Sequence, residues 1–279
     1  MKIAVTGASG FVGRYVVAEL DSLEVTTTLV VRSLINLSTS SPKNNIVKID
    51  LDNLPLNSYE LMNSPDVLIH LAWDGLPNYK SIHHFQDVLP NQFKFLKTII
   101  ESGLKNLIVT GTCFEYGMQS GSLREDLQTQ PINPYGFAKN VLRCQLEYLQ
   151  QVNPFNLTWA RLFYMYGEGQ AETSLFTQIR RSVERKDNIF NMSGGEQLRD
   201  YLSVQEVVKY IVALAMTKRD NGVVNICSGT PISVRRLVEK WIRENNWFID
   251  INLGYYPYPD YEPMAFWGNR QKLDKCLEV

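Results

Sequence analysis

The segment TGASGFVG (6–13) follows a short apolar run and precedes an amphipathic stretch, and it limits the possible fold more than any other segment. Its glycines, Gly7, Gly10 and Gly13, are spaced GxxGxxG. Glycines in this position let the backbone turn tightly between strand and helix and approach a pyrophosphate at the helix N-terminus. The pattern predicts a dinucleotide-binding strand–turn–helix unit, and the alternative is a tight turn that binds no ligand.

Short apolar runs alternate with helical patterns through the first 163 residues. The runs are KIAVTG (2–7), VTTTLVVR (25–32), NIVKID (45–50), DVLIHLAW (66–73), NLIVTGT (106–112) and LTWARLF (157–163). This alternation predicts the α/β class, as a Rossmann-type doubly wound parallel sheet with helices on both faces. Ligands in such sheets bind beyond the carboxyl ends of the strands.

The alternation breaks after residue 163, and one more strand pattern, VVNICSG, follows at 223–229. We expect a dinucleotide-binding Rossmann domain formed by 1–163 together with about 203–228. The remaining parts, 164–202 and 229–279, are expected to form a smaller C-terminal substrate-binding lobe.

Composition bears on the class of partner and on the compartment. Hydrophobic residues make up 44% of the chain, charged residues make up 20%, and the net charge is −1, which favours neither nucleic acid nor a polybasic membrane surface. The four cysteines are scattered and only three histidines exist, so a reduced, cytoplasmic protein without a metal site is expected. No stretch reaches the ~18 apolar residues of a membrane span, and no membrane partner is expected. A polar, turn-rich insertion occupies 33–45, and His70, inside a predicted strand, is expected to be buried.

The segment NPYGFAKN (133–140) places Tyr135 and Lys139 four residues apart at the start of a predicted amphipathic helix. Positions i and i+4 share one helix face, so the phenol and the ammonium project side by side. A phenol has an ordinary pKa of ~10, and a neighbouring ammonium favours its ionised form and lowers that pKa. A tyrosine tuned in this way can exchange a proton with a hydroxyl or carbonyl oxygen. The alternative is a Tyr–Lys pair on the surface.

Taken together, TGASGFVG, DVLIHLAW, VTGTCFEYG and PYGFAK resemble the extended short-chain dehydrogenase/reductase family. That family includes nucleotide-sugar epimerases, dehydratases and ketoreductases. Three further segments resemble its later landmarks in the same order: RLFYMYGEGQ (161–170), LRDYLSVQEVV (198–208) and NICSG (225–229). The resemblance therefore extends over nearly the whole chain.

The resemblance implies catalytic roles for three residues. Tyr135 and Lys139 match the family's YxxxK pair, and Thr112 matches its catalytic Ser/Thr. Tyr135 would then exchange the proton, Lys139 would hold the nicotinamide ribose, and Thr112 would hydrogen-bond the reacting oxygen. The alternative of another class is a non-catalytic dinucleotide-binding regulator, and the intact trio argues against it.

The resemblance also implies a cofactor site. Asp50 and Leu51 match adenine-contacting positions, although Asp50 also suits an ordinary turn. Leu71, Ala72 and Trp73 should line the cofactor, which is compatible with core packing. The full expected set is Gly7, Ser9, Gly10, Phe11, Val12, Gly13, Arg32, Asp50, Leu51, Leu71, Ala72, Trp73, Tyr135, Lys139 and Phe163.

Arg32 bears on the choice of cofactor. An NAD-selective site usually offers an acidic residue to the ribose at the end of the second strand, and here Arg32 and Ser33 stand there. A guanidinium suits the 2′-phosphate of NADP. We expect NADPH, with NADH as the alternative, and a solvated surface arginine as the other interpretation of Arg32.

The substrate side is expected to be formed by Tyr79, Thr112, Cys113, Phe114, Tyr164 and Arg199. Arg199 matches a position that grips a nucleotide diphosphate, and the alternative is a surface salt bridge with Asp200 or a glutamate. Tyr164 stands where many relatives have a substrate-binding Asn. Phe114 and Tyr164 suit either an apolar sugar pocket or the core.

Cys113 and Phe114 stand where the family's dehydratases carry Asp and Glu, and neither can act as the acid or base that water elimination needs. The resemblance therefore implies NAD(P)H-dependent reduction of the 4-keto group of a nucleotide-linked 4-keto-6-deoxyhexose. An example is dTDP-4-dehydro-6-deoxyglucose to dTDP-fucose, in deoxysugar and surface polysaccharide biosynthesis. The alternative is an NAD-dependent 4-epimerase. Relatives commonly form homodimers through the helices that correspond to 90–102 and 135–150, and burial within one monomer explains those helices equally well.

Overall fold

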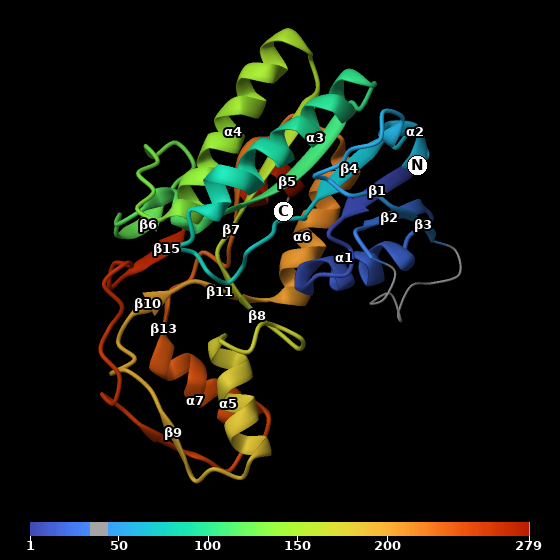
Figure 1. The fold of residues 1–279 in the computed structure, drawn as a ribbon. Helices are drawn as coiled ribbons and strands as arrows, with labels where there is room; N and C mark the ends of the chain where they lie inside the picture. Colours follow the sequence, from blue (N-terminus) through green and yellow to red (C-terminus); the bar gives the residue numbers. More distant parts are fainter. Residues whose placement is uncertain (34–43, 279) are drawn as a thin grey trace.

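The computed structural model describes residues 1–33 and 44–278, so most of the polar insertion at 33–45 lies outside the described residues. A seven-stranded sheet forms the centre, in the order β12-β7-β5-β4-β1-β2-β3 (Figure 1). Its strands are β1 (Lys2–Thr6), β2 (Thr26–Val31), β3 (Asn45–Lys48), β4 (Val67–His70), β5 (Asn106–Thr112), β7 (Asn156–Leu162) and β12 (Gly222–Ile226). Every neighbouring pair runs parallel. The predicted Rossmann-type sheet is confirmed.

Helices cover both faces of the sheet. Helices α1 (Phe11–Asp21) and α6 (Val204–Thr217) pack on one face, and α3 (Leu89–Glu101) and α4 (Pro134–Val152) pack on the other (Figure 1). Because both faces are covered, strand residues are buried whichever way they point, which explains the continuous apolar runs in the sequence. Ile3 and its neighbours Ala4 and Val5, for example, are all buried.

Helix α4, which carries the YxxxK pair, has a well-defined start. Asn133 is its N-cap, and the Asn133 side chain accepts a hydrogen bond from the Gly136 N–H at 2.8 Å. Pro134 occupies the first helical position, where its missing N–H costs no helical hydrogen bond. The start of the helix is thus fixed close to the carboxyl end of β5.

A smaller lobe lies below the sheet in Figure 1. It contains α5 (Leu175–Glu184), α7 (Val234–Glu244), and the parallel pair β9 (Ile189–Asn191) and β14 (Asp250–Asn252). Its own core includes Ile179, Phe190, Leu237, Val238 and Trp241. Two short pairs lie between this lobe and the sheet: β8 (Tyr164–Tyr166) with β11 (Tyr201–Ser203), and β10 (Leu198–Arg199) with β13 (Ile232–Ser233).

The end of the chain differs from the expected assignment of 229–279 to the small lobe. Strand β15 (Phe266–Gly268) pairs with β6 (Gly121–Leu123), and α8 (Gln271–Leu277) packs on the sheet's α1/α6 side. The physical reason is that Leu273 of α8 is fully buried in the core that α1 and α6 share. Three short helices complete the described chain: α2 (Ser58–Leu61), the π-helix η1 (His84–Val88) and the 3-10 helix η2 (Cys113–Tyr116).

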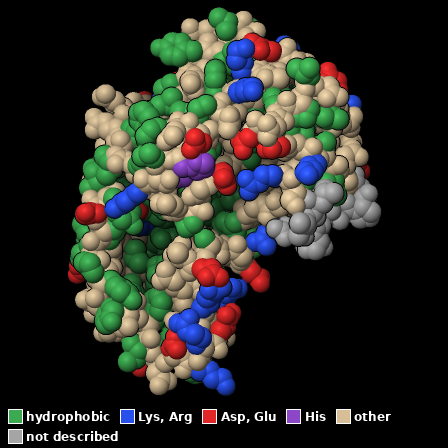
Figure 2. All heavy atoms as spheres, in the orientation of Figure 1, with side chains coloured by type: hydrophobic (Ala, Val, Ile, Leu, Met, Phe, Trp, Pro, Cys, Tyr) green, Lys and Arg blue, Asp and Glu red, His purple; other side chains and the backbone are tan. Residues whose placement is uncertain are grey.

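The surface carries charges of both signs. Figure 2 shows acidic and basic side chains lying close together over the face drawn, and a hollow between the sheet domain and the lower lobe. Within the described part of the chain, no helix has the length and apolar character needed to cross a membrane.

Candidate active site

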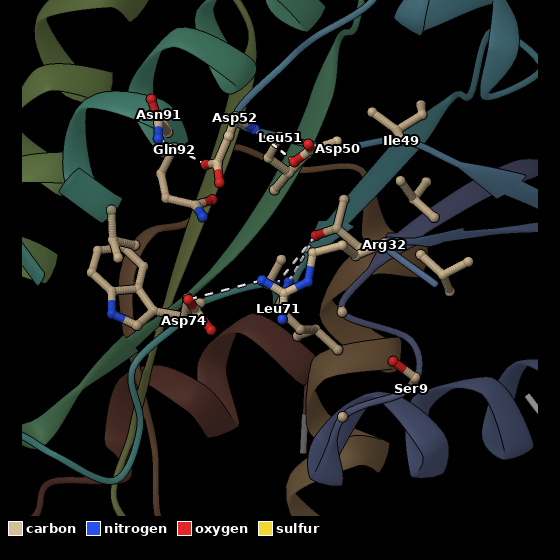
Figure 3. A pocket seen from close by; sticks show the side chains of 18 of the residues that line it. Ser9, Arg32, Ile49, Asp50, Leu51, Asp52, Leu71, Asp74, Asn91 and Gln92 are labelled. Carbon is tan, nitrogen blue, oxygen red and sulfur yellow. Dashed lines mark hydrogen bonds and ion pairs between the residues drawn. The ribbon is translucent and has the colours of Figure 1, made fainter. Parts of the chain in front are cut away.

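A cleft of about 340 Å³ opens at the carboxyl ends of β1, β2 and β4 (Figure 3). Nine of the expected cofactor residues line it: Gly7, Ser9, Gly10, Arg32, Asp50, Leu51, Leu71, Ala72 and Trp73. Seven polar residues that were not among the expected site residues also line it: Thr6, Asp52, Asp74, His83, Asp87, Asn91 and Gln92. The other six expected cofactor residues are not among the lining residues: Phe11, Val12, Gly13, Tyr135, Lys139 and Phe163.

The glycine turn has the shape that a dinucleotide needs. Gly7 has φ +70°, and a Cβ there would stand 2.8 Å from the Ala72 nitrogen. A Cβ on Gly13 would stand 2.1 Å from the Gly7 carbonyl oxygen, so only glycine lets the first turn of α1 pack on this loop. The N-cap of α1, Gly10, has no side-chain cap. No side chain therefore competes with a phosphate group for the N–H groups at this helix end. The residues of the turn fit a bound dinucleotide.

The far end of the cleft holds one arginine among carboxylates. Arg32, directly after β2, lies 3.9 Å from the Asp74 carboxylate, which follows β4 on the other side of the cleft (Figure 3). Asp50 accepts hydrogen bonds from the Asn53 side chain and the Asp52 N–H, which lower its pKa. Asp50 shapes a turn, as one alternative foresaw, and it also lines the cleft; its contact with adenine stays a prediction.

The three expected catalytic residues meet at the end of β5. Tyr135, Thr112 and Lys139 are all buried, and the Lys139 ammonium donates a 2.8 Å hydrogen bond to the Thr110 carbonyl. Burial raises the pKa of the Tyr135 phenol, the neighbouring Tyr79, Glu115 and Cys113 raise it further, and the interaction with Thr112 lowers it. The expected lowering of this pKa by the ammonium is not found, and burial raises the pKa instead, so the phenol keeps its proton near neutral pH.

Burial has the opposite effect on the lysine. It lowers the pKa of Lys139 to about 7, and the Glu115 carboxylate acts against that lowering. The ammonium also lies 4.0 Å from the centroid of the Trp73 ring.

A buried ion pair lies directly behind this trio, and the sequence interpretation did not find it. The Glu115 carboxylate accepts hydrogen bonds from the Thr112 N–H at 2.8 Å, the Trp159 indole at 3.0 Å and the Arg161 guanidinium at 2.8 and 2.9 Å. The Glu115 and Arg161 side chains are 0% and 1% exposed. A Cβ on Gly111 would stand 2.1 Å from the Trp159 nitrogen, so the network also requires glycine there.

Aromatic rings also surround Tyr135. The Tyr79 ring lies 5.6 Å from that of Tyr135 and 5.1 Å from that of Phe114. Burial raises the pKa of the Cys113 thiol, which keeps this side chain neutral beside them. These expected substrate residues therefore form a largely apolar wall next to Tyr135.

The Arg199 side chain already has hydrogen-bond partners within the protein. Its guanidinium is 4% exposed and pairs with Glu262 at 2.9 Å, and it also donates to the Leu198 and Met264 carbonyls. The Tyr164 hydroxyl donates to the same Glu262 carboxylate. The pair joins Arg199 to a glutamate, as one alternative foresaw, but it is buried. Contact of Arg199 with a diphosphate stays a prediction.

His70 is fully buried, as expected from its strand position. It lies between the Thr6 hydroxyl at 2.8 Å and the Gln92 amide oxygen at 2.7 Å, and burial lowers its pKa to about 3. No cluster of His, Cys, Asp or Glu suited to a metal ion occurs in residues 1–33 and 44–278. Helix α4 exposes Phe137, Tyr148 and Val152, and dimer formation through it stays a prediction.

Comparison with known proteins places this geometry in context. The model of the NAD dependent epimerase/dehydratase family matches residues 3–227. The chain is 32% identical to dTDP-6-deoxy-L-talose 4-dehydrogenase (NAD(+)) of Aggregatibacter actinomycetemcomitans, over 96% of this chain and 99% of that protein. It is 27% identical to GDP-6-deoxy-D-talose 4-dehydrogenase of the same organism, over 86% and 78% of the two chains. Among solved structures, MoeE5 in complex with UDP-glucuronic acid and NAD has a TM-score of 0.83 and 23% identity, covering 100% of this chain and 93% of that one.

Proposed function

The chain belongs to the NAD dependent epimerase/dehydratase family, among the extended short-chain dehydrogenases/reductases that modify nucleotide sugars, and we propose that it is a 4-ketoreductase. Its proposed substrate is a nucleotide-linked 4-keto-6-deoxyhexose. The observation that carries the proposal is the buried, protonated Tyr135 with Thr112 and Lys139, in contact with Trp73, which lines a cleft that fits a dinucleotide. Reduction needs a proton donor at this place, and a buried phenol that holds its proton at neutral pH can supply it.

The names of the two relatives support the same chemistry in the reverse direction. A 4-dehydrogenase for a 6-deoxytalose removes a hydride from C4 and a proton from the hydroxyl group on C4, and its reverse is reduction of the 4-keto sugar. The 32% identity over almost the full length of both chains makes this reaction pair the best-supported one for the chain.

The chain's own residues account for the proton side of the reaction. Tyr135 gives its proton to the substrate's carbonyl oxygen, and Thr112 hydrogen-bonds that oxygen and holds it in place. When bound, the reduced nicotinamide supplies the hydride to C4, so ketone, hydride and proton together give the alcohol. The Lys139 ammonium stabilises the phenolate that remains until it is reprotonated, and it also binds the ribose hydroxyls. The rings of Tyr79 and Phe114 offer apolar contact to the C6 methyl group.

The test is stoichiometric. Purified protein receives dTDP-4-keto-6-deoxyglucose, or the 4-keto sugar obtained by oxidising dTDP-6-deoxy-L-talose at C4, together with NADH or NADPH. We expect one reduced cofactor to be consumed per sugar, with a 6-deoxyhexose as product. CDP-, GDP- and UDP-linked sugars in the same assay identify the base. Interconversion of UDP-glucose and UDP-galactose without net cofactor use would instead make the chain a 4-epimerase, and cofactor binding without turnover would make it a regulator.

Cofactor selectivity is proposed to depend on Arg32, with NADPH preferred. Arg32 lies at the ribose end of the cleft, where a guanidinium pairs with a 2′-phosphate, and the Asp74 carboxylate competes for it. We expect Arg32→Ala to weaken NADPH binding about 10-fold or more, the value of a charge-assisted hydrogen bond. Asp74→Asn should strengthen NADPH binding, since it removes the competitor and a repelling charge. NADH binding to the same variants is the control, because it lacks the 2′-phosphate. Wild-type protein that binds NADH as tightly as NADPH would refute this role of Arg32.

A further inference from the structure

The indole of Trp73 faces the catalytic lysine. The Lys139 nitrogen lies 4.0 Å from the ring centroid, and the same ring meets Tyr135 edge-on at 6.0 Å. The Thr110 carbonyl accepts a hydrogen bond from the same ammonium. An aromatic face attracts a cation, and the attraction is larger when the cation has lost its water. Trp73 therefore favours both the charge and the position of a buried ammonium.

His84 holds the indole in that orientation. The Trp73 indole N–H donates to His84 Nδ1 at 3.1 Å, and His84 Nε2 lies 2.8 Å from the Asn78 carbonyl. An indole nitrogen can only donate and a carbonyl can only accept, so Nδ1 must carry the lone pair and Nε2 the proton. These two contacts define a neutral imidazole in one tautomer, and the ring is fully buried.

The loop between β4 and η1 supports His84 from outside. Gly75 has φ +84°, and a Cβ there would stand 3.1 Å from the His84 ring. The Tyr79 carbonyl accepts a hydrogen bond from the Tyr135 N–H at 3.2 Å. The same loop thus packs on His84 and contacts the start of the catalytic helix.

We infer that Trp73 and His84 are a positioning pair for Lys139, in which His84 accepts the indole N–H and the indole keeps its face on the ammonium. The inference rests on the proposed function in one respect, that Lys139 supports the proton transfer of Tyr135. It adds a role for a histidine that neither the sequence pattern nor the family resemblance explained.

The Trp73–His84 pair is expected to affect the charge of Lys139 near neutral pH. Because burial lowers the pKa of Lys139 to about 7, small contributions decide how much of it is charged near neutral pH. Burial also lowers the pKa of His84, with smaller contributions from His83 and Lys139, while the Asn78 carbonyl and Asp74 act in the opposite direction. The uncharged Tyr135 ring, from α4, lies 5.3 Å from the imidazole. Protonation below this lowered pKa turns Nδ1 into a donor, and the acceptor for Trp73 is lost.

The test follows the Lys139 side chain directly. Protein labelled with ¹³C at the lysine Cε is titrated by NMR, and Lys139→Met identifies the signal. We expect Trp73→Leu to lower the pKa of Lys139 by about one unit. His84→Phe, which removes the acceptor, should lower it in the same direction. Combining the two should give no further lowering, because both act through the indole.

His84→Asn is the conservative control. Its amide oxygen can accept the indole N–H near the position of Nδ1 but does not titrate, so the pKa of Lys139 should stay near the wild-type value. In wild type, kcat/KM is expected to fall at acidic pH as His84 becomes protonated, and in His84→Asn this fall should be absent. This variant decides the matter if His84→Phe does not fold.

Two outcomes would overturn the inference: an unchanged pKa of Lys139 in Trp73→Leu, or additive effects of Trp73→Leu and His84→Phe. Either would leave His84 as a packing residue. Failure of the proposed function is a separate result, since it appears as absent turnover of every keto sugar by wild type. The lysine titration needs no substrate.

Discussion

Tyr135→Phe is expected to lower kcat by about 10²–10⁴, the usual contribution of a general acid or base. The ring remains and fills the same buried place between Tyr79 and Trp73, so the wall around the sugar is kept. The lost phenol removes the proton that the carbonyl oxygen must receive. The dissociation constant for NADH or NADPH should change little, because the cofactor cleft is lined by other residues.

The measurement combines steady-state kinetics on the 4-keto sugar with a cofactor-binding titration. Tyr148→Phe is a matched control, since Tyr148 is on the same helix and its side chain is mostly exposed. It should retain wild-type rates. A Tyr135→Phe variant within a few-fold of wild type would mean that another group supplies the proton.

Glu115→Gln is expected to destabilise the protein by about 3–5 kcal/mol, because it leaves the Arg161 charge buried without its counter-charge. The same substitution should lower kcat, since the Glu115 carboxylate also fixes the backbone N–H of Thr112. Urea unfolding measures the free energy of unfolding of each variant. An m-value equal to that of wild type shows that the same surface is exposed on unfolding.

Two controls separate the buried charge from ordinary surface effects. Replacing both partners, as Glu115→Leu with Arg161→Leu, removes the unpaired charge and should recover much of the stability. Asp126→Asn breaks the exposed pair with Arg124 and should destabilise the protein far less than Glu115→Gln. If Glu115→Gln costs no more than Asp126→Asn, the buried pair does not contribute to stability as argued.

The features that the sequence predicted are those whose signal is local. The glycine turn and the YxxxK pair each lie within eight or fewer residues, and the strands appear within a few residues of the apolar runs. The run 66–73, for example, extends past β4, because Leu71, Ala72 and Trp73 leave the sheet to line the cleft. The order of motifs then predicted the family, which the comparison confirms.

What the sequence did not predict depends on contacts between distant segments. Glu115 and Arg161 are 46 positions apart, and a charged residue in or just after a strand looks the same in sequence whether it is buried or solvated. Arg199 and Glu262, 63 positions apart, form a largely buried pair, whereas the sequence predicted a diphosphate contact or a surface salt bridge. The sequence predicted that Trp73 contacts the cofactor and predicted no role for His84. Their hydrogen bond depends on the conformation of the loop that joins them, which spans eleven positions.

The order of strands in the sheet has a consequence for synthesis of the chain. Strand β7 is paired with β5 on one side, but its other neighbour, β12, is made only after much of the small lobe. On the ribosome, one edge of β7 therefore stays open while residues 163–221 emerge. An unpaired, hydrophobic strand edge is a site for aggregation. Chains that stop before Gly222 should consequently be recognised by chaperones and proteases, and splitting the gene between the lobes would not give two independently folding products.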